Sequence, residues 1–172
     1  QSELFDAIMM TMGLHSEEMP TVITRHKVYE ERESFNILLA EDNLINQTLT
    51  INLLQKRGHR VTLASNGIEA VEAYRKGDFD LILMDIQMPE MDGFAATRAI
   101  RHLMREKSDS KGRMSNIPII AMTAHAMTGD REKCIDAGMD DYVSKPIKPE
   151  ALYSVINKVA RKSQGEKEQK RT

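Results

Sequence analysis

DLILMD, residues 80–85, continues as IQMPEMDG, residues 86–93, and together these two segments predict the architecture of the chain. The apolar run LILM is typical of a strand buried on both faces, and it ends at the carboxylate of Asp85. Pro89 and the Asp-Gly pair that follows it exclude a longer strand and mark a loop that leads into a helix. Open α/β sheets carry their chemistry at the carboxyl ends of their strands, so Asp85 is a candidate functional residue.

The composition limits the kind of protein to which this chain can belong. Its 172 residues suffice for one domain with appendages, and a net charge of −2 does not indicate a surface for nucleic acid or membranes. Cys134 is the only cysteine, which fits a reducing compartment, so we expect a cytoplasmic segment, whether or not its parent protein is anchored to a membrane. The sequence shows no signal peptide and no apolar run of ~20 residues. The chain begins with Gln1, and we expect it to be part of a longer protein.

Strand and helix patterns alternate along most of the chain. We expect strands at 37–40, 60–64, 81–84, 117–122 and 141–143, and helices at 43–57, 66–77, 94–105, 128–137 and 149–162. Such a βα repeat predicts an α/β fold with a parallel sheet and helices on both faces. At this size the expected form is a doubly wound, flavodoxin-like (βα)5 sheet with strand order 2-1-3-4-5, in which the first and third strands are neighbours.

The two ends of the chain lack this alternation. Residues 1–13 have apolar side chains at helical spacing and predict a short helix, whereas the irregular, charged segment 14–35 is interpreted as a linker. We expect the sheet domain to occupy 36–162, with an exposed, mobile loop at 106–116. Residues 163–172 are polar without apolar spacing and predict a disordered tail.

Charged and hydroxyl side chains follow four of the predicted strands. Glu41 and Asp42 follow the first strand and Asp85 the third, so these three carboxylates should share one crevice. Thr123 follows the fourth strand and Lys145 the fifth, on the same rim. Crowded carboxylates repel one another unless a cation lies among them, and hard oxygen ligands favour Mg²⁺ or Mn²⁺. A carboxylate nucleophile, a divalent metal, a lysine and a hydroxyl together indicate phosphoryl transfer onto Asp85, giving an aspartyl phosphate.

Four motifs at these positions resemble the receiver (response-regulator) family, and the resemblance covers about 37–160. They are Glu41-Asp42-Asn43, Asp85 within MDIQMPEMDG, Thr123-Ala124 within IIAMTAHAM, and Lys145-Pro146 within DDYVSKPI. The resemblance implies that a phosphohistidine of a histidine kinase core or of a histidine phosphotransfer domain phosphorylates Asp85. It also implies that Asp42, Asp85 and the backbone carbonyl of Gln87 bind Mg²⁺, with Glu41 acting through a metal-bound water.

The same resemblance implies a conformational response to phosphorylation. Thr123 would move towards the phosphoryl group and Tyr142 would change rotamer with it, which remodels the surface around the fifth strand. Lys145 would couple the phosphoryl group to this change. Gln87 and His125 are expected to modulate the site, and His125, two residues after Thr123, would influence how fast the acyl phosphate hydrolyses.

Further expectations concern the Lys145-Pro146 bond and the longer protein to which this segment belongs. The resemblance implies a cis peptide bond between Lys145 and Pro146, and the geometry agrees, because a turn is needed there to direct the lysine back towards Asp85. Asn46 makes the chain similar to the receivers of hybrid sensor kinases. The sequence shows neither a kinase histidine box nor a nucleotide-binding glycine motif, so this segment is expected to be a phosphoacceptor with self-catalysed transfer and hydrolysis, within a hybrid histidine kinase.

The first residues of the chain are similar to its last predicted helix. Residues 3–8, ELFDAI, align without gaps on residues 151–156, ALYSVI, just after the lysine–proline turn. We therefore predict that residues 1–13 are the last helix of a preceding receiver-like domain and that their apolar side chains can mediate self-association.

Two other functions are compatible with this fold. One is a degenerate receiver that serves only for protein contacts. The other is a flavodoxin-type FMN electron carrier with the same strand order, although Glu41 and Asp42 would repel the flavin phosphate after the first strand. No segment resembles a helix-turn-helix output domain, and we expect no contact with nucleic acid and no direct contact with a membrane.

Overall fold

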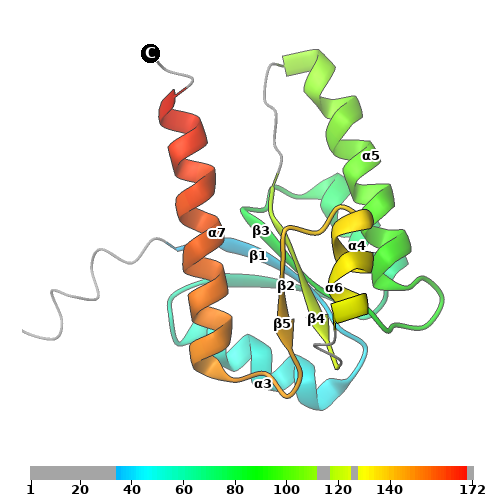
Figure 1. Ribbon diagram of the computed structural model, residues 1–172, viewed down its shortest axis with the longest axis vertical. Helices are drawn as coiled ribbons and strands as arrows, with labels where there is room; N and C mark the ends of the chain where they lie inside the picture. Colours follow the sequence, from blue (N-terminus) through cyan, green and yellow to red (C-terminus); the bar gives the residue numbers. More distant parts are fainter. Residues whose placement is uncertain (1–33, 112–116, 125–127, 170–172) are drawn as a thin grey trace, which may run out of the picture. The chain divides into compact units, whose positions relative to one another are not determined.

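The five predicted strands form a single parallel sheet in the order β2-β1-β3-β4-β5 (Figure 1). A computed structural model of the chain describes residues 34–111, 117–124 and 128–169, which belong to one compact unit. The strands are β1 (Asn36–Ala40), β2 (Arg60–Ala64), β3 (Leu81–Asp85), β4 (Ile119–Thr123) and β5 (Asp141–Ser144). The helices are α3 (Leu44–Gln55), α4 (Gly67–Lys76), α5 (Gly93–Lys111), α6 (Thr128–Asp136) and α7 (Pro149–Gln169). The predicted doubly wound α/β fold and its strand order are confirmed.

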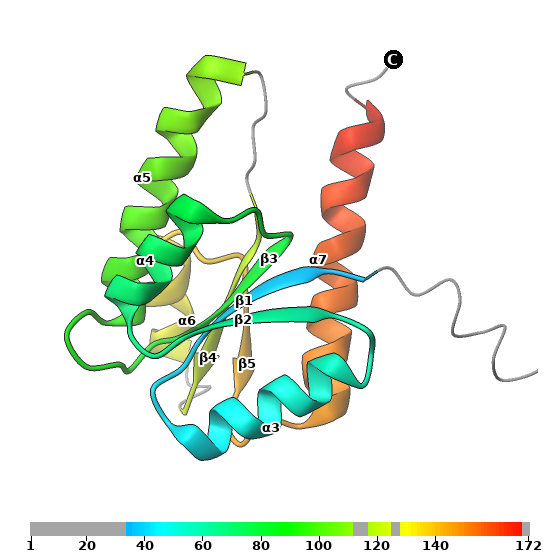
Figure 2. The ribbon, with the colours of Figure 1, turned by 180° about the vertical axis from the view of Figure 1, so that it is seen from behind.

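Helices cover both faces of the sheet, as the opposite views in Figures 1 and 2 show. One apolar layer, which includes Leu39 and Leu83, packs against α3 and α7. The other layer, which includes Leu38, Ile82 and Cys134, packs among α4, α5 and α6. Successive side chains of a strand point to opposite faces, so a strand covered on both sides needs an uninterrupted apolar run. This is why β3 is buried along its whole length, including Asp85 at its carboxyl end.

Polar caps begin the helices that follow β1 and β2. The side chain of Asn43 accepts hydrogen bonds from the backbone N–H groups of Ile45 and Asn46, at 3.0 and 3.2 Å, and starts α3. Asn66 accepts a hydrogen bond from the backbone N–H of Glu69 at 2.8 Å and starts α4, as the sequence pattern predicts. The first of these caps leaves only a short acidic turn between β1 and α3.

The buried face of α3 is not the one that its apolar side chains alone would indicate. Ile45 and Leu49 are apolar and lie at helical spacing, yet they are 77% and 42% exposed. The helix instead buries Gln47, Thr50 and Leu54. Both sets have helical spacing, so the apolar pattern alone does not fix the helix phase, and the Asn43 cap together with the hydrogen bonds of Gln47 selects the second set.

Two helices are longer than predicted. The expected loop at 106–116 is helical as far as Lys111, and the expected disordered tail at 163–172 is helical as far as Gln169, so both predictions are wrong for those residues. Residues 106–111 contain Glu and Lys, and residues 163–169 contain Glu, Lys and Gln, all of which have high helix propensity. Adding residues to a helix that packing has already nucleated is easier than starting one, so apolar contacts are not needed.

Several predictions concern residues that the structure does not describe. The predicted helix at 1–13 lies outside the described residues, as do His125 and the predicted linker at 14–35 apart from its last two residues. The assignment of 1–13 to a preceding domain therefore stays a prediction. Within the described residues, every helix is too short or too polar to cross a membrane.

Candidate functional site

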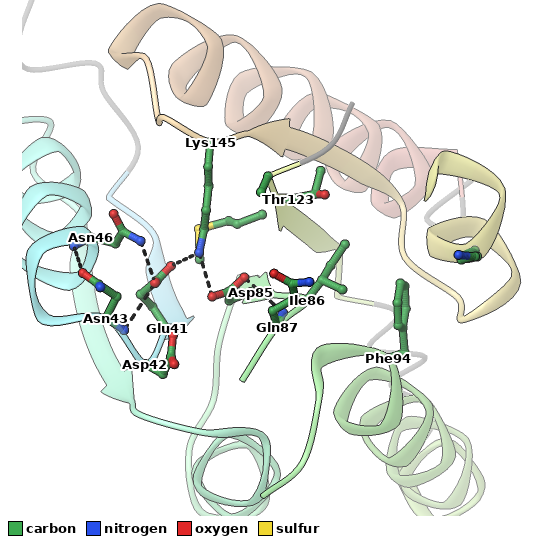
Figure 3. Close-up of a pocket in the computed structure, with 13 residues that line it drawn as sticks. Glu41, Asp42, Asn43, Asn46, Asp85, Ile86, Gln87, Phe94, Thr123 and Lys145 are labelled. Atoms are coloured by element: carbon green, nitrogen blue, oxygen red, sulfur yellow. Dashed lines mark hydrogen bonds and ion pairs between the residues drawn. The ribbon is translucent and has the colours of Figure 1, made fainter. Parts of the chain in front are cut away.

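The carboxyl ends of β1 and β3 lie side by side and bring three carboxylates together (Figure 3). β1 pairs with β3 so that Ala40 lies opposite Met84, and the residues that follow each of them meet at the same edge. One carboxylate oxygen from each of Glu41, Asp42 and Asp85 lies within 4.8 Å of the others. The convergence expected from the strand order is therefore present in the structure.

Lys145 supplies the fixed positive charge of this cluster. It follows β5, and its peptide bond to Pro146 is cis, as predicted. Its Nζ atom lies 2.6 Å from Asp85 Oδ2 and 2.8 Å from Glu41 Oε2. Burial alone would lower the pKa of Lys145, but the hydrogen bonds and charges of these two carboxylates outweigh burial and raise it. Lys145 is therefore an ammonium ion at neutral pH.

Asp85 is buried at the centre of the cluster. Its ionised side chain accepts two hydrogen bonds. Oδ2 accepts one from the Lys145 ammonium, and Oδ1 accepts one from the backbone N–H of Gln87 at 3.3 Å. Burial raises the pKa of Asp85, the hydrogen bond from Lys145 opposes the rise, and the negative charge of Glu41 adds to it, so the net shift is upward. The ionised carboxylate is thus held in a place where one more positive charge would stabilise it.

Glu41 and Asp42 differ in their access to solvent. Glu41 is fully buried, and its carboxylate accepts a hydrogen bond from the Asn46 side-chain amide at 2.9 Å in addition to the ion pair with Lys145. Asp42 is exposed, and together with Glu41 and Asp85 it lines a pocket at the carboxyl ends of the strands. Asp42 is therefore the carboxylate that an incoming ion can reach from solution, whereas Glu41 is fixed by its neighbours.

Thr123 and Tyr142, which were expected to move on phosphorylation, lie on adjacent strands. Thr123 ends β4, is buried and lines the same pocket, and its backbone carbonyl accepts a hydrogen bond from the Lys145 N–H at 2.7 Å. Tyr142, on β5, is half-buried and packs on the layer under α4, α5 and α6. β4 and β5 pair with Ala121 opposite Tyr142, so Thr123 and Tyr142 lie on two strands that are hydrogen-bonded to each other.

The pocket also contains residues that sequence reasoning did not place there. Phe94, at the start of α5, and Lys133, on α6, line it. Figure 3 shows Phe94 on the side of the pocket away from the acidic turn. Asn46 was noted only as a point of resemblance, and its contact with Glu41 was not predicted. One signal was available for it, because a residue in the first turn of a helix that follows the acidic pair must lie close to that pair.

The donor set fits a magnesium ion. Three carboxylates within reach of one another are the hard oxygen ligands that Mg²⁺ prefers, and the single positive charge of Lys145 does not balance their three negative charges. Asp42 and Asp85 would hold the ion together with the backbone carbonyl of Gln87, while Glu41 contributes its charge from behind. When bound, the ion neutralises negative charge on phosphoryl and carboxylate oxygens.

We expect Mg²⁺ to bind at this cluster and to perturb the backbone amides of 41–42 and 85–87. Asp42→Asn and Asp85→Asn should each weaken binding about tenfold or more, because each removes a charged ligand. Amide chemical shifts followed during a Mg²⁺ titration measure the dissociation constant and its location. Shifts confined to other parts of the domain would contradict the assignment.

The raised pKa of Asp85 predicts that its ionised carboxylate makes the folded domain less stable. A carboxyl group with a higher pKa in the folded state contributes stability that is complete at low pH and is lost as the pH rises through that folded pKa. Without divalent metal, Asp85→Asn should therefore raise the free energy of unfolding at neutral pH, because the neutral amide does not carry the cost of a buried charge. Lys145 keeps its partner Glu41 in this variant.

This stability difference should shrink as the pH falls, because protonated Asp85 becomes neutral like the Asn side chain. Urea unfolding of both proteins in a chelating buffer across the acid range measures the difference. A variant that is less stable than the parent at neutral pH, or a difference that grows in acid, would show that ionised Asp85 stabilises the fold.

The sequence is similar to a known protein family and to segments of several characterised proteins. A family model for the response regulator receiver domain matches residues 37–157. Hybrid signal transduction histidine kinase I of Dictyostelium discoideum is 48% identical over 126 residues, which cover 70% of this chain and 7% of that protein. The signal transduction histidine-protein kinase BarA of Escherichia coli is 40% identical over 127 residues, which cover 74% of this chain and 13% of that protein. The chain thus spans only a small part of the length of these relatives.

Solved structures show the same similarity. The receiver domain of a sensor histidine kinase from Pseudomonas aeruginosa, which has a magnesium ion coordinated in its active-site cleft, is 41% identical with a TM-score of 0.64, covering 74% of this chain and 98% of that chain. The receiver domain of a Saccharomyces cerevisiae response regulator, co-crystallised with a histidine phosphotransfer protein, is 34% identical with a TM-score of 0.64, covering 73% of this chain and 86% of that chain.

Proposed function

Because this chain belongs to the response regulator receiver domain family, we propose that it accepts a phosphoryl group on Asp85 from a phosphohistidine in a Mg²⁺-dependent reaction. The observation that carries this proposal is the buried Asp85 carboxylate, which lies 2.6 Å from the Lys145 ammonium and within reach of two further acids. A buried carboxylate with a fixed cation and spare negative charge beside it is arranged for an incoming phosphoryl group and its metal ion.

The transfer step exchanges one bond for another. A carboxylate oxygen of Asp85 attacks phosphorus and forms a P–O bond, while the P–N bond to the donor imidazole breaks and its electron pair stays on nitrogen. Lys145 then follows the negative charge from the Asp85 carboxylate to a phosphoryl oxygen, and the Thr123 hydroxyl can donate to another. Both groups act mainly by electrostatic stabilisation and positioning, as is usual for phosphoryl transfer.

A change of surface would follow from the same contacts. Phosphorylation can shift a conformational equilibrium only by binding one state better than the other. Here the difference would arise when Thr123 and Lys145 meet phosphoryl oxygens, with Tyr142 turning inward on the neighbouring strand. The surface formed by α6, β5 and α7 would change in consequence.

The donor protein is proposed to approach the edge of the sheet near α3. Leu44 and Ile45, in the first turn of this helix, are 76% and 77% exposed beside the acidic turn. Such apolar side chains next to a charged site suit a protein partner rather than a small molecule. We propose a histidine kinase core or a histidine phosphotransfer domain as this partner, and a cytoplasmic segment of a hybrid histidine kinase as the context. Self-association through residues 1–13 stays a prediction.

The test is incubation with Mg²⁺ and acetyl phosphate followed by intact mass. The proposal predicts an added phosphoryl group whose formation requires Mg²⁺. No mass increase in the presence of saturating Mg²⁺ would favour the degenerate receiver that serves only for protein contacts. The FMN carrier is disfavoured by Glu41 and Asp42, which occupy the turn where a flavin phosphate would bind.

A further inference from the structure

The carboxylate of Glu41 is fully buried, so its charge must be satisfied by nearby donors. The Lys145 ammonium lies 2.8 Å from Oε2, and the side-chain amide of Asn46 donates to Oε1 at 2.9 Å. The backbone N–H of Asn43 donates to the same Oε1 at 3.4 Å, a long contact. A buried carboxylate that loses its donors destabilises the folded state, so each of these contacts affects how Glu41 is held.

Lys145 cannot serve Glu41 in every state of the proposed reaction. Its Nζ atom is shared, because it lies 2.6 Å from Asp85 Oδ2 as well. Once Asp85 carries a phosphoryl group, the ammonium is expected to follow the new negative charge. Among the residues that the structure describes, Asn46 is then the side chain left to hydrogen-bond the Glu41 carboxylate.

The next residue of the same helical turn holds the other end of Glu41. The side-chain amide of Gln47, which is buried, donates to the backbone carbonyl of Glu41 at 2.7 Å. The first turn of α3 therefore binds Glu41 through both its main chain and its carboxylate. Because the Gln47 contact fixes the main chain from which the Glu41 side chain extends, rotation of that side chain must break the hydrogen bond from Asn46.

We propose that Asn46 is a positioning residue for the metal site, an inference that rests on the proposed function. Its amide fixes the rotamer of the Glu41 carboxylate, so that the negative charge behind Asp42 and Asp85 stays in place when Lys145 moves. Hydrogen-bond partners of this kind, one step removed from a metal ion, typically change its affinity 10–100-fold when they are removed. Asn46 thereby presets the site for Mg²⁺ without touching the ion.

Asn46→Ala tests this proposal through Mg²⁺ affinity. We expect the Mg²⁺ dissociation constant, measured from amide chemical shifts, to rise about tenfold. Asn46→Leu retains the branched side-chain shape without the donor and should give the same rise, so a folding defect of one variant leaves the other to decide. Thr48→Ala is the matched control on the same helix, because the exposed Thr48 hydroxyl donates only to the Leu44 carbonyl among the contacts described here. It should leave the dissociation constant unchanged.

A double-mutant cycle with Glu41→Gln shows whether Asn46 acts through Glu41. The effect of Asn46→Ala on Mg²⁺ affinity should disappear in the Glu41→Gln background. An equal effect in both backgrounds, or parental affinity in both Asn46 variants, would overturn the proposal. Because the cycle measures Mg²⁺ binding alone, it stands apart from the proposed function, whose failure would appear as a chain that binds Mg²⁺ but gains no mass with acetyl phosphate.

Discussion

Asp85→Asn is expected to abolish the gain of a phosphoryl group from acetyl phosphate and Mg²⁺. The amide is a poor nucleophile and a weaker ligand than a carboxylate, and the other acids cannot replace it because Glu41 is buried behind it and Asp42 is exposed at the rim. Losing the nucleophile of a covalent step removes the reaction itself, so the loss should be complete on the time scale of the parent reaction. Intact mass over a time course measures it.

Asp78→Asn is the control for this variant, because Asp78 is exposed in the turn before β3, at the opposite end of that strand. It should be phosphorylated at the parental rate. Full modification of the Asp85→Asn protein would show that another residue accepts the phosphoryl group. Loss of reaction in the Asp78→Asn protein would show that the assay reports general charge rather than the site.

Gly93→Ala is expected to destabilise the domain by about 2–3 kcal/mol, the upper range for overpacking. A Cβ atom at Gly93 would overlap the carbonyl oxygen of Asp85 and approach Ile86 Cα to 2.9 Å. The Gly93 N–H also donates to the Ile86 carbonyl at 2.9 Å, so the backbone cannot simply move away. The overlap lies on the main chain of Asp85, so Mg²⁺ affinity should fall with stability.

Urea unfolding measures this effect, and Gly77→Ala provides the comparison. A Cβ at Gly77 would approach only the ring of Phe79, at 3.0 Å, and the Ala73 carbonyl, at 3.4 Å, so a side-chain movement relieves most of the contact. The Gly93 variant should unfold at clearly lower urea than the Gly77 variant. Equal stabilities of the two variants would mean that the loop before α5 is free to move.

The acidic cluster could be predicted because few physical rules determine it. An apolar run ending at Asp85 and another ending at Glu41 identify two buried strands, and the parallel βα connection brings their carboxyl ends to one edge. Lys145 was expected on that rim for the same reason. The cis bond before Pro146 needed the resemblance as well, since X-Pro bonds are mostly trans.

Other features depend on competition that the sequence does not resolve. Two sets of α3 residues have helical spacing, and only the cap at Asn43 and the buried hydrogen bond of Gln47 show which set faces the sheet. The sharing of Lys145 between two carboxylates and the contact of Asn46 with Glu41 depend on side-chain distances of a few ångströms. The ends of α5 and α7 were missed because polar residues can extend a helix without an apolar pattern.

The most direct test of the account is the chemical location of the phosphoryl group. Borohydride reduces an acyl phosphate to an alcohol, which converts a phosphorylated aspartate into homoserine and leaves a free carboxylate unchanged. After reaction with acetyl phosphate and Mg²⁺, peptide mass spectra of the reduced protein should show homoserine at position 85 and nowhere else. Homoserine at position 42, or an unmodified Asp85 in a protein that has gained a phosphoryl group, would contradict the account.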